Sequence, residues 1–257
     1  MELSTVLGVP IGTVAVLVGM VYKGASLSML INAAAIMIIF VGTTGAVLNA
    51  IPMHIFKKIP ALLKKILKKQ DLAEVPLLAT SFVEYSQIAR REGLLALEGR
   101  VNEVNDPFMR SGMNMMIDGL DAAFIRDVME SEVEAMAERH RHNALIFSQA
   151  GMYSPTLGVL GAVIGLVAAL GNLNDIDQLG YSIASAFIAT MMGIYFGYVV
   201  CHPIATKLKI LSQEEIAVKR IIIEGILSLQ AGDSPIAVES KMNAFLPQSQ
   251  RKASNRG

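Results

Sequence analysis

The sequence predicts an all-α membrane protein, with four transmembrane helices and a helical cytoplasmic domain inserted between the second and the third. Four segments contain no Asp, Glu, Lys or Arg, namely residues 3–22, 24–56, 142–174 and 178–206. Crossing the hydrocarbon core takes roughly 20 residues at about 1.5 Å each, and a charge at its centre costs about 2.5–3.5 kcal/mol. Each charge-free segment therefore predicts one span. Between the second and the third, apolar residues recur at helical spacing and no useful length alternates as a strand would.

The basic residues predict the orientation. Of the 22 Lys and Arg residues, only Lys23 lies between the first two charge-free segments, whereas 13 lie between residues 57 and 141 and eight after residue 206. Since positive loops stay inside, both termini and the long middle segment are expected in the cytoplasm. The start, Met1-Glu2-Leu3, lacks the positive charge of a signal peptide, so the first span is expected to be retained.

The predicted domains are residues 1–52 (spans 1 and 2), 53–142 (cytoplasmic helices), 143–206 (spans 3 and 4) and 207–257 (C-terminal helices and a basic tail from residue 247). Residues 53–70 combine an apolar face with a lysine face on one helix, whose first turn or kink is marked by Pro60. That pattern suits a helix lying on anionic membrane lipid, and equally a solvated basic face. The lysines are Lys57, Lys58, Lys64, Lys65, Lys68 and Lys69.

Two apolar stripes predict the core of the cytoplasmic domain. The first is Leu77, Leu78, Phe82, Tyr85, Ile88 and Leu95; the second is Met115, Met116, Leu120, Phe124, Val128, Val133 and Met136. Asn105-Asp106-Pro107 predicts a turn between them. After the fourth span, residues 214–229 are expected to continue as a helix that ends at residues 231–235, with a short helix following.

Nothing in the sequence predicts an enzyme, a metal site, a cofactor or nucleic-acid binding. Cys201 is the only cysteine, which makes an intrachain disulfide impossible. His140 and His142 lie on opposite faces of a helix and no partner is spaced to complete a metal site, so they are expected to be interface histidines. No catalytic residues are predicted.

Small residues form stripes on the last two spans. They are Gly158, Ala162, Gly165 and Ala169 on the third, and Ala186, Ala189, Gly193 and Gly197 on the fourth. Such stripes let helix backbones approach closely in lipid, where hydrophobic burial offers no net gain. The contact is either within one subunit or with another subunit or partner helix.

Two prolines and two threonines interrupt the same spans. Pro155 and Pro203 each free a backbone carbonyl and permit a bend. The hydroxyls of Thr156 and Thr190 either bond back to the carbonyl four residues earlier or face a narrow water-filled path.

Several motifs resemble one family. Arg90, Gly93, Leu97 and Glu98 fall in the pattern Arg-x-x-Gly-x-x-x-Leu-Glu, which is similar to the signature of flagellar stator subunits in the MotA/TolQ/ExbB family. Further matches in the family's order are the segments 154–166, 202–205, 224–225 and 232–235. The resemblance implies a bacterial inner-membrane protein that converts ion flow into torque on the flagellar rotor. It would be a subunit of a homo-oligomer, a ring of five, around a MotB-like partner. The partner's single span carries an ion-binding aspartate, and the third and fourth spans of this chain line the ion path.

The resemblance also implies roles for individual residues. Arg90 and Glu98 would contact the rotor switch protein FliG, with Arg91, Glu92 and Arg100 widening the charged patch. Pro155 and Pro203 match prolines tied to channel conformation and torque.

The choice of ion also follows from the resemblance. Sodium-driven relatives have threonines where this chain has Ala162 and Ala189, which leaves Thr190 as the main inward hydroxyl and favours protons. The alternatives are an energiser of outer-membrane transport like ExbB or TolQ, and a non-conducting membrane scaffold.

Overall fold

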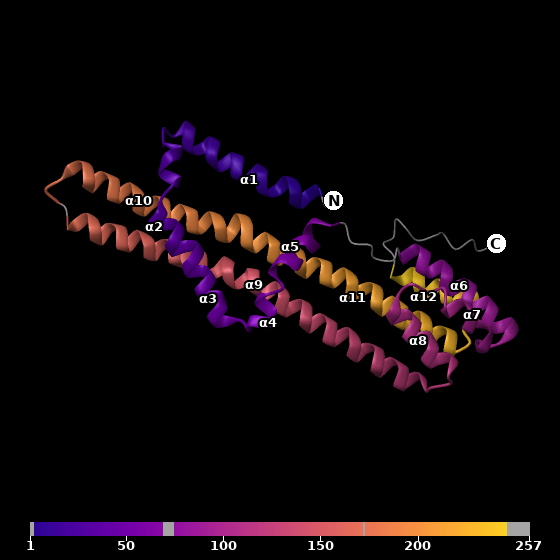
Figure 1. Ribbon diagram of the computed structural model, residues 1–257. Helices are drawn as coiled ribbons and strands as arrows, with labels where there is room; N and C mark the ends of the chain where they lie inside the picture. The colour runs from indigo at the N-terminus through magenta and orange to yellow at the C-terminus, as the bar shows by residue number, and fades with distance from the viewer. Residues whose placement is uncertain (1–2, 69–74, 172, 246–257) are drawn as a thin grey trace. The chain divides into compact units, whose positions relative to one another are not determined.

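A computed structural model describes residues 3–68, 75–171 and 173–245 of the chain (Figure 1). The regular structure of these residues is entirely helical, which confirms the all-α part of the predicted fold class. The chain divides into two compact units. Unit 1 comprises residues up to 70 and residues 140–210, and unit 2 comprises residues 71–139 and those from 211 onward.

Unit 1 begins with an apolar helix and a second, interrupted one. Helix α1 (Leu3–Tyr22) is followed by the 3₁₀ turn η1 (Leu27–Leu30). Then α2 (Ala33–Ile36), the π-helical turn η2 (Met37–Val41) and α3 (Gly42–Ala50) run without a break. Asn32 caps this helix by accepting a hydrogen bond from Ala35 N at 3.1 Å. The charge-free segment 24–56 is thus helical over only part of its length, because Pro52 follows directly on the extended residue Ile51.

Two long helices follow. They are α9 (Ala122–Leu170) and a continuous run of α10 (Ile176–Tyr195), the π-helical turn η4 (Phe196–Cys201) and α11 (His202–Gln230). Both long helices contribute residues to both units. The expected continuation of the last span into a C-terminal helix is confirmed. Among the described residues, three helices are long and apolar enough to cross a membrane, Leu27–Ala50, Ala122–Leu170 and Ile176–Gln230, while Leu7–Tyr22 is apolar but shorter.

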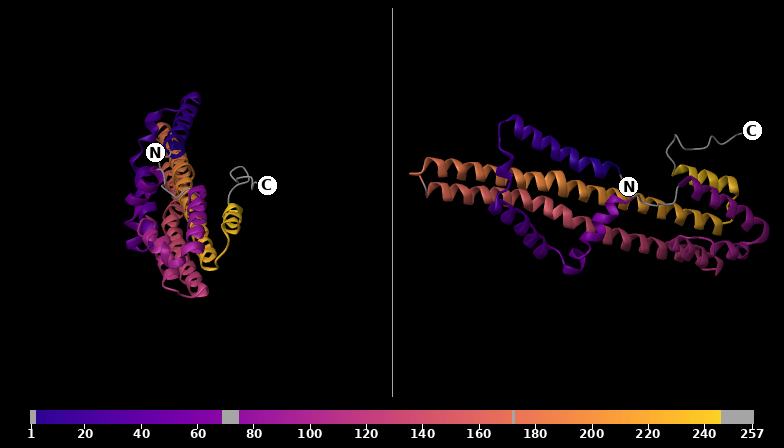
Figure 2. Two further views of the ribbon diagram at one scale, coloured as in Figure 1. Left: turned by 90° about the vertical axis from the view of Figure 1, so that its right-hand side faces the viewer. Right: turned by 45° about the horizontal axis from the view of Figure 1, so that its top comes forward.

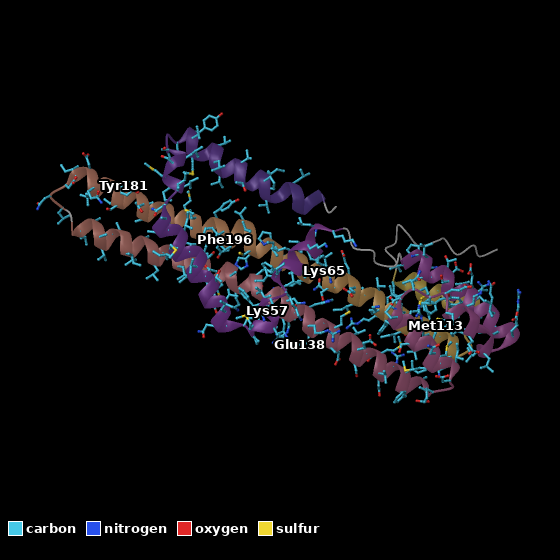
Figure 3. All side chains as sticks on the ribbon, in the orientation of Figure 1. Lys57, Lys65, Met113, Glu138, Tyr181 and Phe196 are labelled. Carbon is cyan, nitrogen blue, oxygen red and sulfur yellow. The ribbon has the colours of Figure 1, made fainter. Side chains whose placement is uncertain are left out.

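The basic segment is two helices rather than one. Helix α4 (Met53–Phe56) ends at Lys57, and α5 (Ile59–Leu67) starts after Lys58 with Pro60 in its first turn (Figure 3 labels Lys57 and Lys65). Leu62 and Ile66 are buried in a cluster with residues of α3, α9 and α11. Leu63 and Leu67, expected on the same apolar face, are 37% and 43% exposed. Lys69 and the basic tail lie outside the described residues.

Unit 2 is built from helices around one apolar core. Besides parts of α9 and α11 it contains α6 (Val75–Glu92), the 3₁₀ turn η3 (Leu94–Leu97), α7 (Glu98–Val101), α8 (Pro107–Ile117) and α12 (Pro235–Ala244). Asp106 forms the predicted turn: its carboxylate caps α8 by accepting from Phe108 N at 2.9 Å and pairs with Lys219 Nζ at 2.9 Å. Fully buried members of the core include Phe82, Leu97, Met113 (labelled in Figure 3), Met116, Ile125, Met129, Ile222 and Ile226.

The second apolar stripe is confirmed only in part: Met116 and Val133 are buried in the core, whereas its members at the start of α9 were predicted on the wrong face. Phe124 is 52% exposed and Val128 is 38% exposed, as is Leu120 just before the helix. The buried row is one residue further on, at Ile125 and Met129. Packing explains why this row is buried. Gly112 of α8 leaves space that Met129 fills, since a Cβ added at Gly112 would lie 2.6 Å from Met129 and from Ile226. In the first stripe, Leu77 and Leu95 are also exposed, at 64% and 71%.

Asp233, in the turn before α12, forms polar contacts with both α6 and α12. Ser86 Oγ, which is buried, donates to the carbonyl of Asp233 at 2.9 Å. Lys241 Nζ binds the Asp233 carboxylate at 2.7 Å. This hydrogen bond lowers the pKa of the Asp233 carboxyl and raises the pKa of Lys241. Ser234 caps α12 by accepting from Ala237 N.

Replacing Phe82 tests this core. A Cβ added at Gly225 would lie 2.6 Å from the Phe82 ring, so the ring fills the space that the glycine leaves. Phe82→Ala is therefore expected to lower the free energy of unfolding by about 3–5 kcal/mol, seen as a lower melting temperature of the detergent-purified protein. Leu77→Ala on the same helix is the control and should change stability by less than about 0.5 kcal/mol. Equal effects of the two would contradict the assigned core.

Candidate functional site

The first candidate site is the contact between α9 and α10 in unit 1, which run side by side in Figures 1 and 2. A Cβ added at Gly193 would lie 2.6 Å from the Ser154 carbonyl oxygen and 2.9 Å from Gly158 Cα. One added at Gly158 would lie 2.9 Å from the carbonyl oxygen of Ala189. The buried Ser154 Oγ also donates to the Gly193 carbonyl at 2.9 Å. The backbones thus touch, and these small residues pack within one subunit.

Both predicted prolines lie next to unusual backbone. Pro155 has no N–H to donate to the Gly151 carbonyl. A Cβ added at Gly197 would lie 2.7 Å from that oxygen and 2.9 Å from Pro155 Cγ. Pro203 comes just after the π-helical turn η4, where His202 N–H bonds to the Gly197 carbonyl five residues earlier. Turns of this kind often mark functional positions in helices.

Each predicted hydroxyl bonds within its own helix. Thr156 Oγ1 donates to the Met152 carbonyl at 3.2 Å, and Thr190 Oγ1 donates to the Ala186 carbonyl at 3.3 Å. Thr190 is half-buried where α9 meets α10, and its Cα would lie 3.4 Å from a Cβ at Gly158. Thr156 is on an exposed face of α9.

The two alanines differ in their surroundings. Ala189 is 3% exposed and packs with Ala35 and Ile39. It also borders a groove of about 220 Å³, whose polar lining includes Ser182 and Ser185. Ala162 is half-buried on α9. The four residues expected along the ion path therefore do not share one surface of the single chain.

Three polar contacts in the charge-free segments were not predicted. Besides the bond from Ser154, the amide of Asn32 donates to Ser185 Oγ, and the hydroxyls of Thr13 and Tyr195 share a hydrogen bond. An isolated hydroxyl or amide in an apolar segment is the sequence signal for such contacts, because it needs a partner in lipid. The sequence does not say which partner it finds.

The second candidate site is a charged patch in unit 2, formed by the end of α6, η3 and the start of α7. Gly93 has φ +86°, a conformation in which a side chain is strained, and it ends α6. Leu97 is fully buried and anchors the turn. Arg90, Arg91, Glu92 and Glu98 are all exposed. Among the residues that the structure describes, these four form no ion pair with one another or with a neighbour.

The border of this patch contains two further groups. Arg100 pairs with Glu103 at 3.3 Å, and both side chains are largely exposed. Tyr85 packs edge to face on Phe82. Burial raises the pKa of the Tyr85 hydroxyl, and the charge of Glu84 raises it further. The exposed charges of the patch therefore lie next to side chains that pack into the core of unit 2.

Comparison with known proteins identifies the family. The model of the MotA/TolQ/ExbB proton channel family matches residues 100–220. Over 251 residues the chain is 47% identical to Motility protein A of Bacillus subtilis strain 168, covering 98% of this chain and 93% of that relative. The chain belongs to this family. The resemblance predicted from the sequence motifs is confirmed.

Solved structures agree. The chain superposes on a chain of the flagellar MotAB stator complex from Bacillus subtilis with a TM-score of 0.90 and 48% identity, covering 96% of each chain. It superposes on a chain of Campylobacter jejuni MotAB (C. jejuni) with a TM-score of 0.91 and 30% identity, covering 99% and 100%. These likenesses confirm the expected class of function, a flagellar stator ion-channel subunit, and favour it over the alternatives. The chain is accordingly a multi-pass protein of the bacterial inner membrane.

Replacing Gly193 tests the contact between α9 and α10. Gly193→Ala places a Cβ within 3 Å of the opposite backbone, so the helices must separate. Forcing extra atoms into a packed site costs about 1–3 kcal/mol, and the melting temperature of the purified protein should fall accordingly. Gly180→Ala on the same helix, where nothing lies within 4 Å of the added Cβ, should keep or slightly raise the melting temperature, because alanine favours a helix over glycine. An unchanged melting temperature for Gly193→Ala would contradict the close contact.

Proposed function

We propose that this chain forms an ion channel together with a MotB-like single-span partner and converts ion flow into torque on the flagellar rotor. The observation that carries the proposal is the pair α9 and α10: two apolar helices in backbone contact, with hydroxyls but no carboxylate in residues 142–174 and 178–206. The titrating group then comes from the partner's aspartate. The chain supplies the channel wall and acts neither as an enzyme nor with a cofactor.

The proposed topology has four spans. Helix α1 has 20 residues, roughly the number needed to cross the hydrocarbon core, and becomes the first span beside the three longer helices. Positive-inside bias places both termini and residues 53–142 in the cytoplasm. The buried face of α5 then packs on the neighbouring helices of unit 1, while its lysines approach anionic lipid of the inner leaflet.

Within this channel we assign the ion path to the region of Thr190, Thr156, Ala162 and Ala189. Thr190 lies where α10 meets α9, and Ala189 borders the groove beside that contact. Thr156 and Ala162, on α9, would face a neighbouring chain. A ring of five subunits around the partner would bring these positions together. Pro155 and Pro203, next to Gly197 and η4, are assigned to changes in channel conformation.

We assign the charged patch on unit 2 to the rotor contact. Arg90 and Glu98 are its centre, with Arg91 and Glu92 at its edge, and the partner is the rotor switch protein FliG. Exposed charges of both signs set the rate and register of an encounter more than its affinity. That suits a contact that forms and breaks repeatedly.

The choice of ion can be tested in a stator-deleted flagellated cell that expresses this chain with its partner. Ala162 and Ala189 offer no hydroxyl, whereas a sodium ion needs several oxygen ligands. Protons are therefore expected: swimming should continue when sodium is removed at constant membrane potential and stop with a protonophore. Each proton would supply about 2.3 kcal/mol per 100 mV. Swimming that needs sodium would refute the choice of ion but keep the stator.

Charge reversal tests the rotor contact. The double variant Arg90→Glu with Glu98→Lys keeps the net charge but reverses both central charges, so like charges would meet across the contact. Swarming should be largely lost, while membrane insertion and co-purification with the partner stay at wild-type levels. The matched control is Glu134→Lys with Arg139→Glu, two exposed charges on α9 outside the patch. Normal swarming of the first variant would contradict the assignment.

A further inference from the structure

A groove of about 430 Å³ opens in unit 1 where the start of α1 meets α5, η4 and α11. Figures 1 and 2 show this end of α1 beside α5. Its lining is apolar apart from Tyr198 and Lys207, and its apolar part includes Gly8, Val9, Ile66, Val199 and Pro203. For comparison, a cavity of about 150 Å³ holds a benzene molecule, so this groove has room for a segment of an acyl chain.

Two glycines of α1 create the groove. At Gly12 an added Cβ would lie 2.9 Å from Val199 Cγ1, so the helix touches η4 there. One turn earlier, at Gly8, nothing lies within 4 Å of an added Cβ. Helix α1 therefore diverges from η4 between Gly12 and Gly8. The apolar side chains that line the resulting groove are not covered by other described residues of unit 1.

The polarity of the groove follows the limit of the charge-free segment. Val199, Pro203 and Lys207 are spaced by four residues, so they follow one face of the helix. Lys207 is the first charge after residue 206 and stands about 12 Å along the helix from Val199. Tyr198, 61% exposed, also lines the groove and offers a hydroxyl. Because Tyr198 directly precedes Val199, this hydroxyl stands away from the Lys207 end. An apolar slot that ends at an ammonium group matches a lipid with an anionic head.

We propose that this groove binds one anionic phospholipid of the inner leaflet, with an acyl chain along Gly8, Ile66 and Val199 and the phosphate at Lys207. The proposal depends on the membrane orientation in the proposed function, because the Lys207 end must lie at the cytoplasmic surface. Basic pockets between membrane helices on that side bind anionic head groups generally. The lysines of α5, which supplies Ile66, add to the attraction.

Native mass spectrometry of the delipidated full-length chain, co-purified with its partner, tests the site. Phosphatidylglycerol should be retained as about one molecule per subunit of this chain, and phosphatidylcholine far less. Gly8→Leu fills the groove without meeting other atoms at its Cβ and should reduce retention at least about tenfold, while Gly19→Leu, equally open but outside the groove, should not. Lys207→Gln should weaken retention of phosphatidylglycerol about fivefold, and Lys209→Gln should leave it unchanged.

Several results would overturn the proposal. Equal retention of the two lipids, or retention unaffected by both Gly8→Leu and Lys207→Gln, would show that the groove is no anionic-lipid site. Retention of inorganic phosphate alone at the same level would show that the site binds phosphate and needs no acyl chain. If Gly8→Leu changed the number of protein chains per complex but not the amount of lipid retained, the groove would be a contact with another protein chain. Lipid retention is measured without a rotor and without ion flow. A chain that fails to support swimming could therefore still retain the lipid, so the two proposals can fail independently.

Discussion

The backbone contact between α9 and α10 is the constraint on which unit 1 depends. Lipid gives two apolar helices no hydrophobic reason to associate, so their contact must come from close packing and hydrogen bonds between them. Gly158 and Gly193 remove the side chains that would hold the backbones apart, and Ser154 adds a hydrogen bond to the Gly193 carbonyl. The same approach brings Gly197 against Pro155, so the packing contact and the unusual backbone around η4 are one feature.

This contact decides what the rest of α9 can do. Because its small residues are used within the subunit, α9 presents large apolar side chains elsewhere: Val159 and Val163 are 51% exposed and Val167 is 64% exposed. A helix that displays such side chains meets either lipid or another chain. In a channel subunit this is the surface on which a partner helix is expected, and the exposed Thr156 lies on the same helix. Packing inside the subunit thus prepares the outer surface for assembly.

The sequence predicts features that a single element determines, and fails where two elements must be compared. Charge-free length predicted the apolar helices, and Asp106-Pro107 predicted the start of α8, because a cap acts within a few residues. The face of α9 was misjudged because Phe124 and Val128 have the same period as Ile125 and Met129. Only the space at Gly112, on a different helix, selects the second row. Likewise the buried position of Ala189 depends on Ala35 and Ile39 of another helix.

The motif in unit 2 shows how structural and functional residues share one short segment. Gly93 and Leu97 recur in the family's pattern for reasons of folding: one reverses the chain at positive φ and the other is fully buried. Arg90 and Glu98 flank them and remain exposed. Since Ser86, one turn before Arg90, is bonded to the Asp233 carbonyl, the end of α6 is held by the turn before α12 as well as by the core. The proposed rotor contact would require such a support, because mobile side chains on a mobile helix would lose the register with the partner.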